Sequence, residues 1–173
     1  VANAQGTGVS SAASNVVQIS KINSEIVTTI LLDITNLVSQ NSANLVIGDG
    51  SGDAYLTKLD STKNGFIYRV EMMCIQTPDS GGSVVSNINL VADSSARASA
   101  HDFASTGTEL SPIVAGGNWA QGHFEKSTNG PVGNALTAGL HNYYLHLVAG
   151  TGGGGAGTYT AGKFIIKLYG SNF

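Results

Sequence analysis

A phosphate-binding spacing stands near the end of the chain, where the residues from Gly157 to Lys163 read G-x-x-x-x-G-K. A nucleotide-binding loop of this kind continues with Ser or Thr, which holds magnesium, and opens a helix whose amides hold the phosphates. Here Phe164 takes the hydroxyl position, and the run "FIIKLYG" that begins with it is β-branched and aromatic. This run predicts a strand, so we interpret Lys163 as the start of the final strand and expect no nucleotide site.

Alternation along this final strand divides its side chains between the two faces of a sheet. One face, which we expect to be buried, carries Phe164, Ile166 and Leu168. The two lysines of the other face predict contact with solvent, and that face carries Lys163, Ile165, Lys167 and Tyr169.

Oxygen-bearing side chains recur between Asp49 and Asp60 at the offsets of a calcium-binding EF-hand loop. An EF-hand requires Gly at the sixth offset and Glu at the last, but the chain has Ala54 and Asp60 there. The flanking segments also resemble strands, so we expect a turn closed by an Asp side chain. A weak calcium site made by Asp49 and Asp53 stays open as an alternative. Otherwise we predict no metal and no cofactor.

Histidine, serine and cysteine give no further site with recognisable spacing. His141 and His146 are five apart in a predicted strand and therefore point to opposite faces, while His101 and His123 lie in predicted loops without ligand spacing. No G-x-S-x-G nucleophile motif occurs. The single Cys74 lies in an apolar run, so we expect a buried, unreactive thiol. The sequence therefore predicts a protein that is not an enzyme.

Tyrosines gather towards the C-terminus, where aromatic side chains line either a sugar site, a protein interface or the core. Packing in the core and on the sheet is the interpretation that we favour for Tyr143, Tyr144, Tyr159 and Tyr169.

Strand-like segments separated by turn residues make up most of the chain. They cover 25–39, 44–48, 54–59, 66–76, 83–93, 140–150 and 162–170, with short strands on either side of Trp119. The Asn64–Gly65 pair predicts a β-hairpin, and the Gly-rich segment 151–161 predicts a loop that joins the last two strands as a second hairpin. Segment 94–105 reads as one helical turn or a loop, and 129–139 reads as a loop. About eight strands without a long helical period predict a single antiparallel β-sandwich that resembles a jelly roll.

Composition narrows the classes of partner. The 173 residues suit one domain, only 11% of them are charged, and the net charge of -3 offers no basic field for nucleic acid. No apolar segment has the length of a membrane span, and the first twenty residues lack the regions of a signal peptide. Low charge with many apolar side chains predicts that copies of the chain cover part of one another, as a homo-oligomer.

The first twenty residues are rich in small side chains and predict an extended N-terminal arm, with the sandwich domain over 21–173. We expect the arm to reach a neighbouring subunit and to add a strand to a sheet edge there. Its apolar anchors are expected to be Val16, Val17, Ile19 and Ile22.

Three patches of sequence resemble a known group of proteins. The ending "NYYLHLVAGTGGGGAGTYTAGKFIIKLYG" resembles that of virion structural proteins from tailed phages of marine bacteria, cyanophages included. The segments "IGDGSGDAYLTKL" and "EMMCIQTPDSGGSVVSNINL" resemble two further parts of that group. The resemblance covers about half of the chain and implies a β-sandwich component of a virus particle, on or near the capsid surface.

The function that we expect from this resemblance is that of a capsid decoration or cement subunit. Its partners would be the major capsid protein or other virion proteins, and copies of itself, with a trimer favoured by analogy to phage surface proteins. Direct binding to nucleic acid or membrane is not expected. Two alternatives remain: a fibre or receptor-binding module for surface glycans, with Asn118 and Trp119 as its candidate pair, and a subunit of a non-viral extracellular filament or surface layer.

Overall fold

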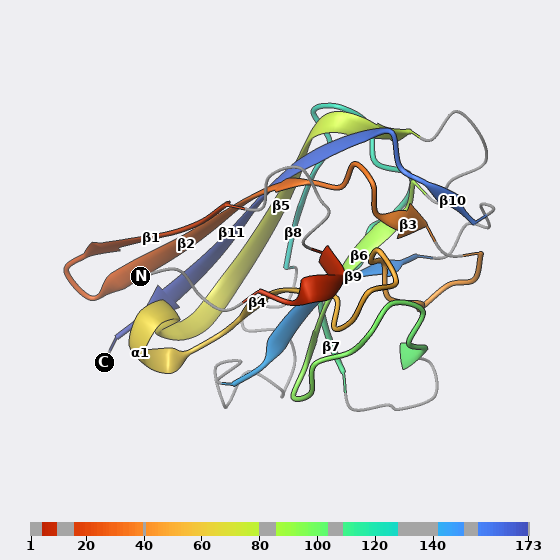
Figure 1. Cartoon of the computed structure of the whole chain (residues 1–173). Coiled ribbons are helices and arrows are strands. Elements are labelled where there is room, and N and C mark those ends of the chain that lie inside the picture. The colour runs from red at the N-terminus through yellow and green to blue at the C-terminus, as the bar shows by residue number, and fades with distance from the viewer. Residues whose placement is uncertain are drawn as a thin grey trace.

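Two antiparallel β-sheets lie face to face in a computed structural model of the chain (Figure 1), which describes residues 5–9, 16–39, 41–79, 86–103, 109–127, 142–150 and 156–172. The five-stranded sheet has the order β1 (Val16–Ile22), β2 (Glu25–Asp33), β11 (Ala161–Ser171), β5 (Phe66–Asp79) and β8 (Phe124–Lys126). The four-stranded sheet has the order β4 (Tyr55–Lys58), β9 (Tyr144–Ala149), β6 (Ile88–Asp93) and β7 (Leu110–Ile113). Smaller elements are β3 (Val38–Ser39), which pairs with β10 (Gly157–Thr158), the 3-10 turn η1 (Thr7–Val9) and the one-turn helix α1 (Ser61–Asn64).

The strand pairing has the nested order of a jelly roll. Among the eight strands of the two main sheets other than β1, the first pairs with the last, β2 with β11, and the second with the seventh, β4 with β9. The third pairs with the sixth, β5 with β8, and the fourth with the fifth, β6 with β7. A long antiparallel ribbon that rolls up gives this nesting, because successive pairs then fall in alternate sheets. The predicted all-β, jelly-roll-like sandwich is confirmed.

The core lies between the sheets and follows from alternation along the strands. In β11 the buried side chains are those predicted, Phe164, Ile166 and Leu168, and in β2 they include Ile30 and Leu32. Trp119 closes this core from the loop before β8: its ring lies edge-on to Phe164 with centroids 5.5 Å apart, and its Nε1 donates to the Ile88 carbonyl at 2.7 Å. Burial of each such side chain contributes about 1.5–3 kcal/mol. Cys74 is buried as predicted, and burial raises the pKa of its thiol.

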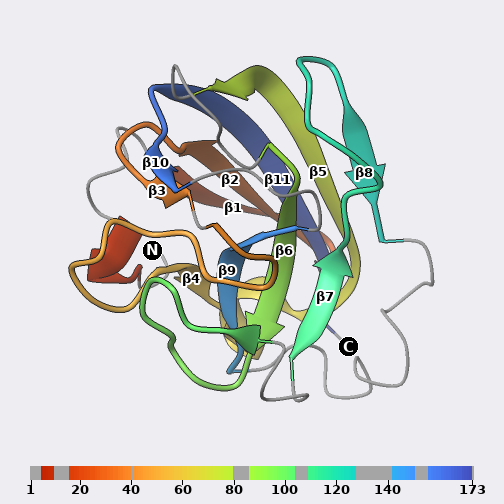
Figure 2. The same cartoon turned by 90° about the vertical axis from the view of Figure 1, so that its right-hand side faces the viewer.

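Both predicted hairpins are wrong. β4 and β5 flank Asn64–Gly65 but belong to different sheets, and so do β9 and β11 (Figure 2). Between β4 and β5 the chain forms α1, capped by Asp60, and then crosses at Gly65, whose φ is 67°. A side chain at Gly65 would meet the Ser171 carbonyl at 2.8 Å. Both the positive φ and this close approach of the backbone therefore require glycine. Turn residues predict a local reversal, but the nested pairing decides which sheet receives the next strand.

The described parts of the first twenty residues lie on their own domain rather than extending from it. The turn at Asn23–Ser24 folds β1 back on β2, with Val16 opposite Leu31 and Ile22 opposite Glu25. The predicted boundary between 20 and 21 therefore falls inside a strand. Earlier in the chain, the amides of Gly6 and Gly8 donate to the carbonyls of Tyr55 and Asp53, and Val9 is buried in the core.

No described helix has the length and apolar character needed to span a membrane, since α1 is the only α-helix in the described ranges and has four residues.

Candidate protein-binding surface

One row of apolar residues crosses four strands on the outer face of the five-stranded sheet. Strand register places Leu31 of β2 opposite Ile165 of β11, Ile165 opposite Met73 of β5, and Met73 opposite Phe124 of β8. Leu31 is 38% exposed and Phe124 46% exposed, while Ile165 and Met73 are half-buried. We call these four residues the apolar row.

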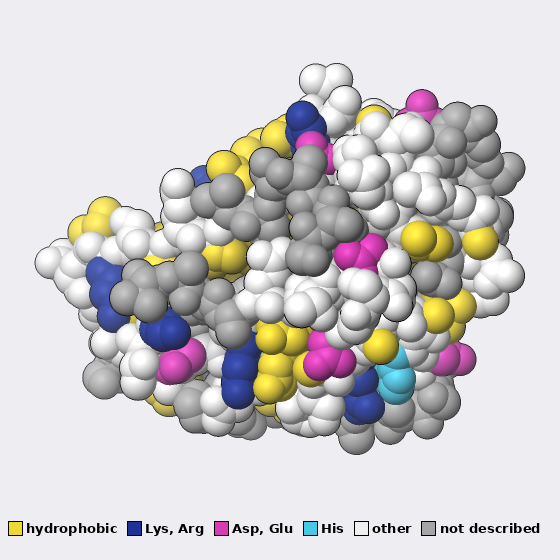
Figure 3. All heavy atoms as spheres, in the orientation of Figure 1, with side chains coloured by type: hydrophobic (Ala, Val, Ile, Leu, Met, Phe, Trp, Pro, Cys, Tyr) yellow, Lys and Arg dark blue, Asp and Glu magenta, His cyan; other side chains and the backbone are white. Residues whose placement is uncertain are grey.

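The apolar row adds hydrophobic side chains to a sheet face that the sandwich does not need to bury. An antiparallel sheet with one buried face places polar side chains on the other. The inward neighbours Leu32, Met72 and Phe164 already fill the core, yet the outward side chains beside them are also apolar. In Figure 3, hydrophobic side chains follow the upper left margin of the molecule, where Figure 1 shows β1, β2 and β11.

A polar row lies beside the apolar row on the same face, with Thr29 opposite Lys167, Lys167 opposite Glu71 and Glu71 opposite Lys126. Glu71 pairs with Arg69 and accepts a hydrogen bond from the Tyr169 hydroxyl at 2.8 Å. Burial alone would raise the pKa of Glu71, but the hydrogen bonds from Arg69 and Tyr169 outweigh it and hold the pKa below its usual value. Glu71 is thus paired within the chain, while Lys126 and Lys167 give this side of the apolar row a net positive charge.

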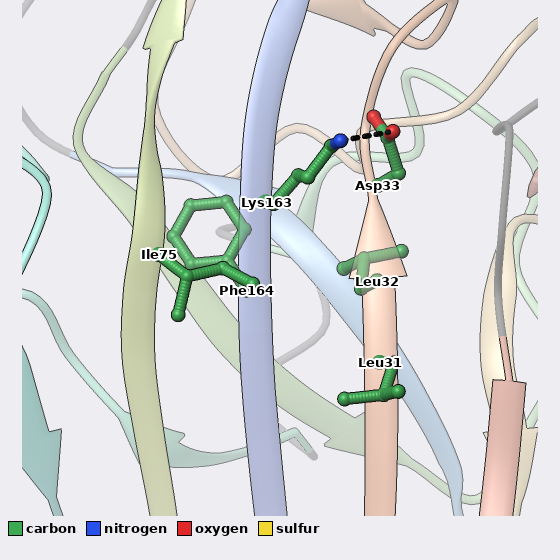
Figure 4. Close-up of a pocket in the computed structure, with 6 residues that line it drawn as sticks. All are labelled: Leu31, Leu32, Asp33, Ile75, Lys163 and Phe164. Atoms are coloured by element: carbon green, nitrogen blue, oxygen red, sulfur yellow. Dashed lines mark ion pairs between the residues drawn. The ribbon is translucent and has the colours of Figure 1, made fainter.

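A shallow pocket lies at the other side of the apolar row (Figure 4), lined by Leu31, Leu32, Asp33, Ile75, Lys163 and Phe164. Ile75 is 38% exposed, and Lys163 Nζ lies 3.6 Å from Asp33 Oδ2 at the rim. Burial opposes ionisation of Asp33, but hydrogen bonds from Thr35 and the charge of Lys163 keep its pKa below the usual value. The pocket offers an apolar floor and a paired charge at its edge, which suits an apolar side chain of a protein partner.

The outer face of the four-stranded sheet is covered by the chain's own loops, in contrast to the apolar row. Segment 94–103 lies against this face (Figure 2), where the Phe103 ring packs 5.6 Å from the His146 ring, and β6 and β9 are buried at nearly every position. Segment 41–54 lies beside it, pairs with the edge of β9 through the bridge from Val46 to Val148, and joins 94–103 through the bridge from Leu45 to Asp102. Under them His146 is fully buried, and its Nε2 accepts from the Arg97 amide at 3.2 Å. Burial lowers the pKa of His146 to about 4.

Two motifs considered for binding chemistry have structural roles. Lys163 lies in the final strand, as predicted, although β11 begins two residues earlier, at Ala161. Its Nζ lies 3.6 Å from Asp33 Oδ2, and no helix follows it. Asp49 closes the predicted turn, since its Oδ1 accepts from the amide and hydroxyl of Ser51 at 2.9 and 2.6 Å. Asp53 forms a bridge with Ala98. No group of three or more His, Cys, Asp or Glu side chains converges within the described ranges.

The other candidate residues are dispersed. His101 and His146 both contact the Phe103 ring at the four-stranded sheet. His123 Nε2 lies 3.0 Å from Glu125 Oε1 beside β8, and His141 is outside the described residues. Trp119 is buried, so it cannot stack on a sugar as the glycan alternative requires. The four tyrosines do not form one site. Tyr159 is part of the core and Tyr143 packs against the core, whereas Tyr144 and Tyr169 lie on different sheets.

The four predicted interface residues all belong to β1, an edge strand. Val17 packs against the core, Ile19 is half-buried and Ile22 is 69% exposed, whereas Val16 is placed only by its register opposite Leu31. Their contact with a neighbouring subunit stays a prediction. The apolar row was missed because its members come from four distant segments, and only register brings them together.

Comparisons of the chain with family descriptions, with curated proteins and with solved structures find no match. The fold by itself does not select a function, because jelly rolls occur in capsid proteins, lectins and cupins. The surface features that bear on function are the apolar row and the edge strand β1.

Proposed function

We propose that this chain is a virion structural protein, a capsid decoration or cement subunit that binds other virion proteins through the apolar row. The observation that carries the binding mode is the contrast between the two outer faces, of which one is covered by loops and the other exposes Leu31 and Phe124. Exposed apolar groups arranged together and bordered by polar residues are typical of protein interfaces. The virion role rests on the sequence resemblance, and the jelly-roll fold agrees with it.

The shape and charge of the surface favour a protein partner over a small substrate. Four neighbouring strands spaced about 4.8 Å apart make the apolar row a broad, shallow surface. Two of the adjoining charge pairs are made within the chain, Asp33 with Lys163 and Arg69 with Glu71, and the exposed Lys126 and Lys167 leave a modest positive border that suits the polar rim of a protein interface. Leu31 and Phe124 at its two ends are suited to act as anchors, each contributing about 1–2 kcal/mol when covered. We propose binding rather than catalysis as the activity.

The proposed partners are the major capsid protein or another virion protein and further copies of this chain, at the capsid surface. A trimer follows only from analogy to phage surface proteins, whereas the edge strand β1 favours pairing about a two-fold axis.

Electron microscopy of the native assembly tests this function. An antibody raised against the chain, with gold label, is applied to virus particles purified from the source culture. Label over capsid shells is the expected result. Label at tail tips would instead support a receptor-binding module, and label on cell-surface filaments a non-viral subunit; either would overturn the proposal.

A further inference from the structure

The two sheets present four edge strands, and three of them are protected against pairing with another chain. The edge of β4 is covered by the chain itself, since Gly6 and Gly8 donate to the carbonyls of Tyr55 and Asp53 at 3.0 and 2.8 Å. β7 contains Pro112, which has no amide donor, and β8 has only three residues, two of them charged. Short strands, proline and charge are the usual means by which proteins protect sheet edges.

The fourth edge, β1, has none of these protections. It has seven residues, contains no proline, and pairs with β2 in one unbroken register without a bulge. Its only charged residue is Lys21, the type that usually protects an edge. Lys21 is turned away, because its Nζ donates to the Thr62 carbonyl of α1 at 3.1 Å. Among the described residues, β2 is the only strand that pairs with β1.

We propose that β1 pairs with β1 of a second copy of this chain, antiparallel, about a two-fold axis at Ile19. Such an axis, perpendicular to the sheet, keeps the outer face of both copies on the same side. Because side chains alternate, a residue can then pair only with one that lies an even number of positions away. A single register uses all seven positions: Val16 with Ile22, Val17 with Lys21, Gln18 with Ser20, and Ile19 with itself.

The chemistry of β1 fits this register. Ile22 is the most exposed large hydrophobic residue of the described chain, and the pairing places it beside position 16 of the second copy, next to Leu31 there. Each Lys21 faces Val17, and the two lysines lie about 13 Å apart along the strand direction, so like charges do not meet. Gln18 and Ser20, both exposed, are matched polar partners. The result is one continuous sheet of ten strands.

This inference deepens the proposed self-association of the subunit and rests on that part of the proposed function alone. The isolated chain tests it, so the capsid role and the strand pairing can fail separately. Two copies joined in this way also leave the apolar row uncovered, because the pairing uses the edge and not the outer face.

Sedimentation velocity of the purified chain at micromolar concentration measures the association. We expect a dimer for the wild type. In Ile19→Lys two lysines face each other directly, and the dissociation constant should rise at least about tenfold. The matched control is Gln18→Lys, in which the new lysine faces Ser20 and the effect should be below about threefold. A wild type that stays monomeric, or equal effects of the two variants, overturns the proposal.

Disulfide trapping tests the register itself and does not depend on how well the lysine variants fold. Ile19→Cys should form a linked dimer under mild oxidation, because the self-paired positions have Cα atoms about 5 Å apart. Gln18→Cys alone should not link, since its equivalent lies diagonally at about 7–8 Å, but it should link when mixed with Ser20→Cys. Cys74 is buried and does not interfere. A dimer in which Ile19→Cys fails to link contradicts the two-fold axis at Ile19.

Discussion

The two sheets of this sandwich treat their outer faces differently. The four-stranded sheet is covered by segments 41–54 and 94–103, and its strand β6 is buried almost throughout. The five-stranded sheet leaves its outer face open along the apolar row, although its inner face alone supplies the core. Folding requires only one buried face per sheet. The covered face is therefore completed by the chain itself, and the open face carries apolar surface in excess of what folding needs.

The same contrast separates the buried polar groups of the two sheets. Under the loops, Asp93 is fully buried and pairs with Arg97 at 3.2 Å, close to the neutral His146. On the open face, the Glu71–Arg69 pair leaves Arg69 half exposed. Charge on the covered face is tied to folding, whereas charge on the open face remains available to screen or orient a partner.

The largest effect should come from comparing two adjacent residues of β11. Phe164→Ala removes a fully buried ring that contacts Trp119 and should cost about 3–5 kcal/mol of unfolding free energy. Ile165→Ala, on the open face, should cost about 1 kcal/mol or less. Urea titration followed by circular dichroism measures both. Similar costs for the two variants would show that the open face is covered within the chain after all.

The covered face should make stability depend on pH. The folded pKa of His146 is lowered to about 4, so the unfolded chain takes up the proton first as pH falls. The contribution of neutral His146 to the free energy of unfolding is fully present above about pH 6.5. It is lost as the pH falls towards 4, by up to about 3 kcal/mol. Burial is the main cause, with Asp93 opposing it and Arg97 and His101 adding to it.

Urea titrations at a series of pH values check this dependence. His146→Gln is the comparison variant, because it keeps a polar side chain but cannot titrate. Its stability should change less between pH 6.5 and 4 than that of the wild type. An unchanged slope in the variant would mean that His146 does not carry the acid sensitivity.

Substitutions in the apolar row should weaken binding to capsids without changing the free energy of unfolding. Leu31→Glu and Phe124→Glu place charge in the apolar row and should weaken binding to capsids at least about tenfold, with unfolding free energies within about 0.5 kcal/mol of the wild type. Val114→Glu is the matched control, since Val114 is 63% exposed but lies beyond β7, off the apolar row. Cosedimentation with particles measures the binding. Equal losses for all three variants would argue against a specific surface.

Local alternation is what the sequence predicts well in this chain. The two faces of β11 follow from residues 163–169 alone, because period-two patterning needs no tertiary information. Prediction fails where another segment decides the outcome. Segment 83–93 predicted a strand, but not that β6 is buried at five of its six positions and that Asn89 Oδ1 accepts from the Ala115 amide at 3.0 Å. The Asn64–Gly65 pair likewise predicted a β-hairpin, but β4 and β5 belong to different sheets.

The candidate surface was harder to predict than the fold. Ile165 on the wetter face of β11 is visible in the sequence, but Leu31, Met73 and Phe124 lie 41–134 positions from it. Their alignment depends on three separate registers. The β1 residues were identified as apolar anchors from composition, while their place in an edge strand required the structure.

Two adjacent methionines allow a direct test of the claim that a partner covers the apolar row. Met73 belongs to the row and is half-buried, whereas Met72 is fully buried in the core, and the chain has no other methionine. Oxidation to the sulfoxide follows exposure, so hydrogen peroxide treatment and mass spectrometry report on both residues at once. In the isolated chain Met73 should oxidise and Met72 should not. In the native assembly Met73 should be protected as well; oxidation of Met73 at the same rate in both states would contradict a docking role for this face.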